Sequence, residues 1–172
     1  DVNTNIYVIK RTDLQNIIAD SLAHGYTSFS RDVIRQNLDK KLIRAYRYDG
    51  WYAYIGTLES YFRTSMELLT PDARRGLFGA ADRKIYTKIR NSAPTKYCEG
   101  AEVKNSLLAD GCVIEGTVEN SILFRDVHVG RGTVVKNCVI LQNTDIGDNV
   151  QLNCVITDKD VRIKDGRMLS GH

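Results

Sequence analysis

Long apolar runs, closely spaced cysteines and a concentrated basic face are all absent from this sequence of 172 residues. No apolar run approaches the ~20 residues that a membrane-spanning helix needs, and no signal peptide is recognisable. The four cysteines and three histidines are dispersed and form no C-x-x-C pair, so a zinc site is a weak hypothesis. We expect a cytoplasmic protein with no membrane partner and no bound metal, whose cysteines serve as small buried residues.

Neither sign of charge dominates, because 24 basic and 21 acidic side chains leave a net charge of only +3. Residues 1–92 carry 15 basic and 10 acidic side chains, whereas residues 93–172 carry 9 and 11. Neither half has the clustered basic surface, interleaved with aromatic residues, that is typical of nucleic-acid binding. We therefore predict no nucleic-acid partner. The chain opens at Asp1 without a methionine, so we expect a fragment of a longer protein.

Three stretches of the first half are rich in β-branched and aromatic residues, which predicts strands. They are Asn5–Lys10, Lys41–Tyr48 and Trp51–Gly56, and the turn-like Asp49–Gly50 separates the last two.

Four helices are predicted between and after these strands from apolar periodicity and capping residues. The first starts near Thr12 or Asp13 and ends at Gly25, with a stripe of Leu14, Ile17, Ile18 and Leu22. A short second helix is capped by Ser30, with Val33, Ile34 and Leu38 facing inward. A third is capped by Thr57, with an apolar stripe of Leu58, Tyr61, Phe62, Met66 and Leu69, and a fourth begins at Thr70–Pro71. Residues 80–93 show no period and are interpreted as a linker.

The second half repeats a short motif, an asparagine followed by a small residue and two aliphatic residues. It occurs as NSLL, NSIL, NCVI and NCVI, beginning at Asn105, Asn120, Asn137 and Asn153, in steps of 15, 17 and 16 residues. In this alignment Cys138 and Cys154 share the slot of Ser106 and Ser121. Two further aliphatic groups recur in each repeat, and Gly, Asn and Asp lie between the groups.

Three aliphatic patches per repeat predict a triangular coil, in which each side is a short strand that pairs with its equivalents above and below. We therefore predict a left-handed parallel β-helix of hexapeptide repeats over residues 93–172, preceded by an α/β domain over residues 1–92. A flat antiparallel sheet is the alternative, and it requires shorter and more even spacing between hairpins.

The stretches NIYVI (Asn5–Ile9), FSRDVI (Phe29–Ile34) and YIGTLESYFRTSMELL (Tyr54–Leu69), followed by these repeats, resemble the C-terminal half of the glucose-1-phosphate adenylyltransferase (ADP-glucose pyrophosphorylase) family of glycogen biosynthesis. The resemblance covers nearly the whole chain. It implies that residues 1–92 are the C-terminal part of a nucleotidyltransferase domain.

The resemblance also implies positions for substrate-binding residues. Asn3 occupies the slot of a family serine that contacts the glucose phosphate, Arg31 replaces a family lysine, and Asp32 is retained. Asp32 has a second interpretation as an ordinary acid in the first turn of a helix. Tyr54 occupies the slot of the family aspartate that helps to hold the catalytic Mg²⁺, and a neutral phenol is a poor magnesium ligand.

Three altered slots favour the non-catalytic, regulatory (GlgD-type) branch of the family, in which the β-helix docks on a catalytic subunit in a hetero- or homo-oligomer. The resemblance also admits sugar phosphate or nucleotide effectors, for which Arg125 and Arg131 are candidates. On this interpretation the fragment is inactive alone and holds no cofactor. Two alternatives stay open. One is a truncated catalytic nucleotidyltransferase, and the other is a hexapeptide acyltransferase using His128, the only candidate catalytic histidine within the repeats.

Overall fold

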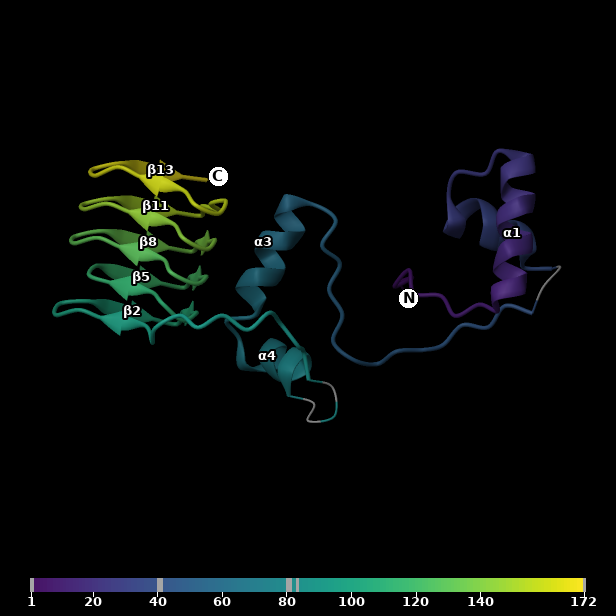
Figure 1. Ribbon diagram of the computed structural model, residues 1–172, viewed down its shortest axis with the longest axis horizontal. Helices are drawn as coiled ribbons and strands as arrows, with labels where there is room; N and C mark the ends of the chain where they lie inside the picture. The colour runs from purple at the N-terminus through teal and green to yellow at the C-terminus, as the bar shows by residue number, and fades with distance from the viewer. Residues whose placement is uncertain (1, 40–41, 80–81, 83, 172) are drawn as a thin grey trace. The chain divides into compact units, whose positions relative to one another are not determined.

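The computed structural model describes residues 2–39, 42–79, 82 and 84–171. Two compact units make up the chain, residues 1–49 and residues 50–172. The boundary predicted between residues 92 and 93 stays a prediction, but in the structure the segment 50–92 groups with the repeats. Figure 1 shows the repeats as a stack of coils that follows two helices, α3 (Leu58–Glu67) and α4 (Pro71–Phe78).

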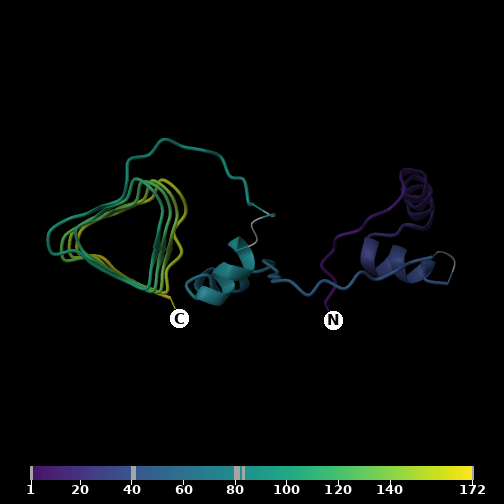
Figure 2. The ribbon, with the colours of Figure 1, turned by 90° about the horizontal axis from the view of Figure 1, so that it is seen from below.

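Residues 96–170 form a parallel β-solenoid with three faces, as Figure 2 shows along the stack. Face A stacks five strands, β1 (Lys96–Tyr97), β4 (Val113–Ile114), β7 (His128–Val129), β10 (Asp145–Ile146) and β12 (Arg162–Ile163). Face B stacks β2 (Glu102–Lys104), β5 (Thr117–Glu119), β8 (Val134–Lys136), β11 (Gln151–Asn153) and β13 (Met168–Ser170). Face C stacks β3 (Leu107–Leu108), β6 (Ile122–Leu123) and β9 (Val139–Ile140), and a bridge from Val139 to Ile156 extends it. The predicted parallel β-helix is confirmed, and the antiparallel sheet is excluded.

One inward row per face supplies the core. On face B, Val103, Val118, Val135 and Leu152 are in register, and the last three are buried. Ile114, Val129, Ile146 and Ile163 form the equivalent row on face A. Each buried aliphatic side chain contributes about 1.5–3 kcal/mol, and stacking is needed because a single coil leaves its inner face exposed to water.

Residues with a left-handed backbone form a column at each corner. Asparagine, aspartate and glycine tolerate this conformation best, which explains their recurrence. The columns are Asn105, Asn120, Asn137 and Cys154; Gly111, Asp126, Asn143 and Asp160; and Gly100, Gly132, Asn149 and Gly166. Amide side chains link neighbouring coils within two columns, as in the bond from Asn105 Nδ2 to Asn120 Oδ1 (2.8 Å).

The repeat alignment based on asparagines is wrong in the fourth coil. Cys154 takes the left-handed position at φ 54°, and the amide of Cys154 donates to Lys136 O just as that of Asn137 donates to Glu119 O. Asn153 is instead the last residue of β11 and pairs with Lys136. The cause is strand register, because Leu152 must pair with Val135 to point inward. Cys154 is therefore exposed, contrary to prediction, while Cys112 and Cys138 are buried as expected.

One shortened corner accounts for the uneven spacing. Strands that pair in neighbouring coils are 17 residues apart, except that the steps from β2 to β5, from β3 to β6 and from β4 to β7 are 15 residues. The corner between β4 and β5 is two residues shorter than the equivalent corners and consists of Glu115 and Gly116. Gly116 is required there, because an added Cβ would collide with the carbonyl oxygen of Thr133 and lie 2.7 Å from that of Gly130.

Helices α3 (Leu58–Glu67) and α4 (Pro71–Phe78) belong to the same unit as the solenoid. Thr57 caps α3 as predicted, in a reciprocal capping box with Ser60, and the Thr70 side chain caps α4. Val139 lies in the outer row of face C yet is fully buried, whereas Leu107 and Ile122 of the same row are partly exposed, so this face is covered at Val139. Leu58, predicted to face inward, is 71% exposed because it lies in the first turn of the helix.

The N-terminal unit contains α1 (Arg11–His24), a π-helical turn η1 (Phe29–Ile34) and α2 (Arg35–Asn37). Gly25 ends α1 in the left-handed conformation as predicted, but α1 starts at Arg11 without a side-chain cap. Ser28, and not Ser30, caps the next turn by accepting from Arg31 N.

The predicted strands of the first half are not observed in the described residues 5–10, 42–48 and 51–56; Lys41 lies outside them. Extended segments become strands only when another strand satisfies their backbone groups. The α/β architecture of this half is therefore not confirmed.

Candidate functional site

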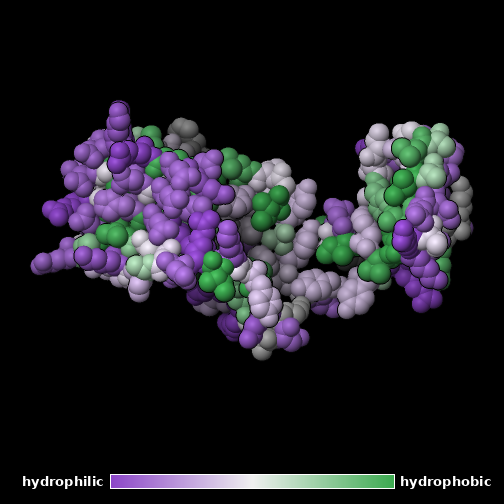
Figure 3. Space-filling model, viewed as in Figure 1, coloured by the Kyte–Doolittle hydropathy of each residue, from purple (hydrophilic) through white to green (hydrophobic). Residues whose placement is uncertain are grey.

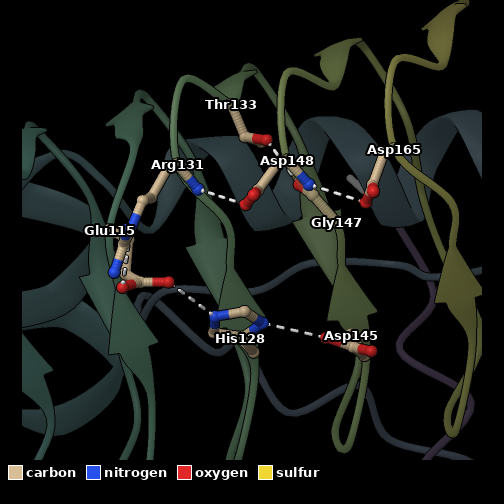
Figure 4. Close-up of polar contacts among 8 residues, drawn as sticks. All are labelled: Glu115, His128, Arg131, Thr133, Asp145, Gly147, Asp148 and Asp165. Atoms are coloured by element: carbon tan, nitrogen blue, oxygen red, sulfur yellow. Dashed lines mark hydrogen bonds and ion pairs between the residues drawn. The ribbon is translucent and has the colours of Figure 1, made fainter.

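A charged cluster lies on the outer side of face A, where strand register places side chains of successive coils above one another. His128, Asp145 and Arg162 occupy equivalent positions on β7, β10 and β12. Glu115 follows β4 at the shortened corner and reaches the same histidine (Figure 4). His128 faces outward, because its neighbours Val127 and Val129 are both buried.

Both ring nitrogens of His128 face carboxylates. Nδ1 lies 2.9 Å from Asp145 Oδ1, and Nε2 lies 3.2 Å from Glu115 Oε2. Arginines continue the cluster at each end, since Arg131 Nε is 3.3 Å from Glu115 and Arg162 Nε is 3.0 Å from Asp145. Opposite charges therefore alternate through five side chains of four coils.

The cluster shifts the titration of its acids and of its histidine. Hydrogen bonding from His128, and then from Arg131 to Glu115 and from Arg162 to Asp145, lowers the pKa of both carboxyl groups. Partial burial lowers the pKa of His128, but the hydrogen bonds to Asp145 and Glu115 outweigh it and raise the pKa overall.

The corner beside this cluster is tied together by carboxylates that accept backbone amides (Figure 4). Asp148 Oδ1 accepts from Arg131 N at 2.8 Å, and Asp165 Oδ1 accepts from Asp148 N at 3.0 Å. The buried Thr133 hydroxyl donates to Gly147 O at 2.6 Å. These bonds fix the loop that carries Arg131, although the Arg131 side chain itself is 80% exposed.

The two predicted effector arginines differ in their surroundings. Arg131 lies at a corner and pairs with Glu115. Arg125 precedes the left-handed Asp126, and its Nε is buried with no hydrogen-bond partner among the described residues. Among the described residues, no hydrogen bond or ion pair links Arg125 to Arg131, so the structure does not join them in one site.

The predicted substrate-binding residues of the N-terminal unit do lie together. Asn3 Nδ2 donates to Ser30 Oγ at 3.2 Å, next to Arg31 in the chain. Asp32 Oδ2 accepts from the backbone amides of Ser28 (2.9 Å) and Thr27 (3.1 Å), and these bonds lower the pKa of Asp32. Arg31 Nε also bonds to Asp32, at 3.2 Å. Asp32 thus organises the turn that begins η1, whatever further role it has.

Tyr54 belongs to the other unit, and its side chain folds over Gly56, where an added Cβ would collide with the ring. Tyr54 is 65% exposed. A tyrosine offers a phenol and no carboxylate, which is the type of ligand that Mg²⁺ prefers in proteins.

A shallow groove runs between α3–α4 and the asparagine corner of the solenoid. Phe62, Met66 and Leu69 line one wall, and Asn105, Asn120, Asn137 and Cys154 line the other. Among residues 2–39, 42–79, 82 and 84–171, no three His, Cys, Asp or Glu side chains are grouped as a metal site. No described helix has the length and apolar character needed to cross a bilayer.

The outer surface of the solenoid differs from one face to another. Figure 3 shows mainly hydrophilic side chains over the solenoid on the face in view. The outer positions of face A are charged in the last three coils, whereas the outer positions of face C are aliphatic. The solenoid thus has one face with an apolar outer row and one face with an ionic outer row.

These features define a hexapeptide-repeat β-helix protein with a preceding helical segment, and comparison with known proteins supports this class. The family model for the GlmU-like C-terminal hexapeptide region matches residues 93–170. Glycogen biosynthesis protein GlgD of Bacillus subtilis is 44% identical over 158 residues, which are 92% of this chain and 46% of that protein. GlgD of Geobacillus stearothermophilus is 46% identical over 130 residues, or 76% of this chain and 37% of that protein.

A glucose-1-phosphate adenylyltransferase of Bacillus thuringiensis is 34% identical over 142 residues, which are 82% of this chain and 38% of that enzyme. The chain spans less than half the length of each of these relatives. It belongs to the glucose-1-phosphate adenylyltransferase family, in the branch of the GlgD-type proteins.

The sequence analysis missed Glu115 and Asp145 as partners of His128. Asp145 lies one coil away, and the 17-residue step from His128 could have predicted it. Glu115 could not be found from the average spacing, because it reaches His128 only through the shortened corner.

Proposed function

We propose that this chain is the C-terminal part of a regulatory, non-catalytic subunit that acts in the cytoplasm beside a catalytic glucose-1-phosphate adenylyltransferase in glycogen biosynthesis. One observation carries the proposal: Tyr54 occupies the slot in which the family resemblance expects a magnesium-binding aspartate. The higher identity to GlgD proteins, 44% and 46% against 34% for the adenylyltransferase, supports it.

The reaction of the catalytic relatives would join the adenylyl group of ATP to glucose-1-phosphate and release diphosphate. Mg²⁺ supplies charge neutralisation in such phosphoryl chemistry, and acidic oxygen ligands must hold it. Tyr54 cannot replace an acid there, so we assign no catalytic step to this chain. Asn3, Arg31 and Asp32 are proposed to retain the outline of a sugar-phosphate site, held by the hydrogen bonds around Ser28 and Ser30.

The solenoid is proposed to wind in the left-handed sense and to serve assembly with the catalytic subunit. Its last coil supports this role. Leu169 occupies an inward position, in register with the buried Leu152, yet it is 44% exposed, and neighbouring Met168 is 73% exposed. β12 and β13 are the last strands of their sheets, and exposed edges with apolar neighbours favour association.

Regulation by sugar phosphates or nucleotides is proposed to involve Arg125 and Arg131. Arg131 is exposed, and an anion could compete with Glu115 for its guanidinium. Alanine at both positions should reduce the effector response of the assembled enzyme. An unchanged response would exclude this part of the proposal.

The test is to purify the full-length protein alone and with its catalytic partner, and to measure ADP-glucose formation from ATP and glucose-1-phosphate. We expect no turnover by the protein alone and higher turnover or an altered effector response in the mixture than with the partner alone. Robust turnover by the protein alone would overturn the proposal and favour the catalytic alternative. A Tyr54→Phe variant is the matched control, since it should behave as the parent does.

A further inference from the structure

Only the protonated form of His128 can donate a hydrogen bond from each ring nitrogen to the carboxylate that faces it. Its two ring nitrogens face two different carboxylates, Asp145 at 2.9 Å and Glu115 at 3.2 Å. A neutral imidazole carries one N–H and can donate to only one of them, whereas the imidazolium donates to both. Deprotonation therefore leaves one nitrogen lone pair facing a carboxylate.

The three residues also come from three different coils. Glu115 lies in the second coil, His128 in the third and Asp145 in the fourth. The backbone already joins these coils, for example through the bond from His128 N to Thr144 O at 3.0 Å. The side-chain bonds therefore add a second, protonation-dependent link across the same stack.

We propose that Glu115, His128 and Asp145 form a carboxylate clamp, a proton-dependent link that tightens the stacking of the second, third and fourth coils as the pH falls through neutrality. The inference is independent of the proposed function, because it concerns the cohesion and surface charge of the solenoid alone. Loss of the proton changes the clamp from a net charge of −1 to −2.

Charged groups approach His128 from two of its neighbouring coils. On β10 the facing group is Asp145, and after β4 it is Glu115. Arg131 from the next corner pairs with Glu115, and Arg162 from β12 pairs with Asp145. The register partner of His128 on β4 is Val113, which does not titrate. Both arginines keep the carboxylates ionised, so the histidine is the group that changes state near neutral pH.

The sign of the effect follows from linkage. The pKa of His128 is raised in the folded protein relative to its ordinary value of about 6.5. The stabilisation is therefore fully present below about pH 6.5 and is lost as the pH rises through the folded pKa. Within that window, release of one proton increases the unfolding equilibrium constant by at most about tenfold per pH unit.

NMR titration of the full chain tests the clamp directly, with His24→Gln and His128→Gln spectra used to assign the imidazole signals. We expect His128 to titrate above the ordinary histidine value of about 6.5, and Glu115→Gln or Asp145→Asn to lower its midpoint. His24→Gln is a suitable control substitution, because His24 pairs with a single carboxylate, Asp20, at 3.3 Å within the exposed surface of α1. A His128 midpoint at or below about 6.5, or one unaffected by both substitutions, would overturn the proposal.

Backbone amide exchange provides the second measurement. The amides of His128 and Asp145 bond to Thr144 O and Val161 O, and their exchange reports local opening of the stack. At pH 6 we expect faster exchange in His128→Gln than in the parent, with the difference shrinking by pH 8.5. His24→Gln should match the parent at both pH values. Equal exchange in the parent and in His128→Gln at pH 6 would refute the clamp, even if the histidine titrates as expected.

Discussion

Cys154 offers a test of the corner rule, because it is the one cysteine in a column otherwise made of asparagine. Its φ of 54° matches 43°, 46° and 51° at Asn105, Asn120 and Asn137. An ordinary L-residue in the left-handed region costs roughly 1–2 kcal/mol, and asparagine costs less because its short amide bonds locally. Cys154 is also exposed, so its replacement sacrifices little apolar burial. We therefore expect Cys154→Asn to stabilise the solenoid by about 1 kcal/mol.

That gain corresponds to an increase in melting temperature of about 2–4 °C for a protein of this size. Calorimetry and far-UV circular dichroism of the full chain under reducing conditions would measure it. The reciprocal variant Asn137→Cys should lose a similar amount, and somewhat more because the bond from Asn137 Nδ2 to Asn153 Oδ1 (2.9 Å) is also lost.

A matched control separates the corner from cysteine chemistry in general. Cys138 is fully buried, and burial raises the pKa of its thiol to about 11. Cys138→Asn should destabilise strongly, because it places an amide inside the coil without a matched partner. If Cys154→Asn is neutral or destabilising while Asn137→Cys costs nothing, the left-handed backbone does not govern residue choice at this corner.

Three further substitutions probe the packing. Val135→Asp should unfold the solenoid, because it buries a charge in the inward row of face B. Val134→Asp, on the outer side of β8, should have a melting temperature near that of the parent. Similar melting temperatures for the two variants would contradict the assigned orientation. Gly116→Ala should cost more than Gly100→Ala in urea unfolding, since the first meets backbone carbonyls and the second pays only for its φ of 82°, and the reverse order would argue against the shortened corner. Thr57→Ala should lose about 1 kcal/mol by removing the bond to Ser60 N at 3.1 Å, measured through the fluorescence of Trp51, the only tryptophan; an unchanged midpoint would mean that the cap does not contribute.

The sequence by itself determined the triangular solenoid. Aliphatic groups at a recurring spacing can all be buried only if the coils stack, and the corner residues are those that adopt a left-handed backbone. Local sequence also placed the start of α3 at Thr57 and of α4 at Thr70. For these caps the determining interaction lies within one helical turn.

Tertiary structure decided everything that depends on which segments lie beside each other. The fourth coil has Asn153 and Cys154 in adjacent frames, and only the pairing of Leu152 with Val135 selects Cys154 for the corner. The carboxylate clamp requires the pairing of β7 with β10, which sets His128 beside Asp145, and the two-residue deletion at Glu115–Gly116. The predicted strands of the first half failed for the same reason, because strand formation depends on a partner segment that local sequence does not specify.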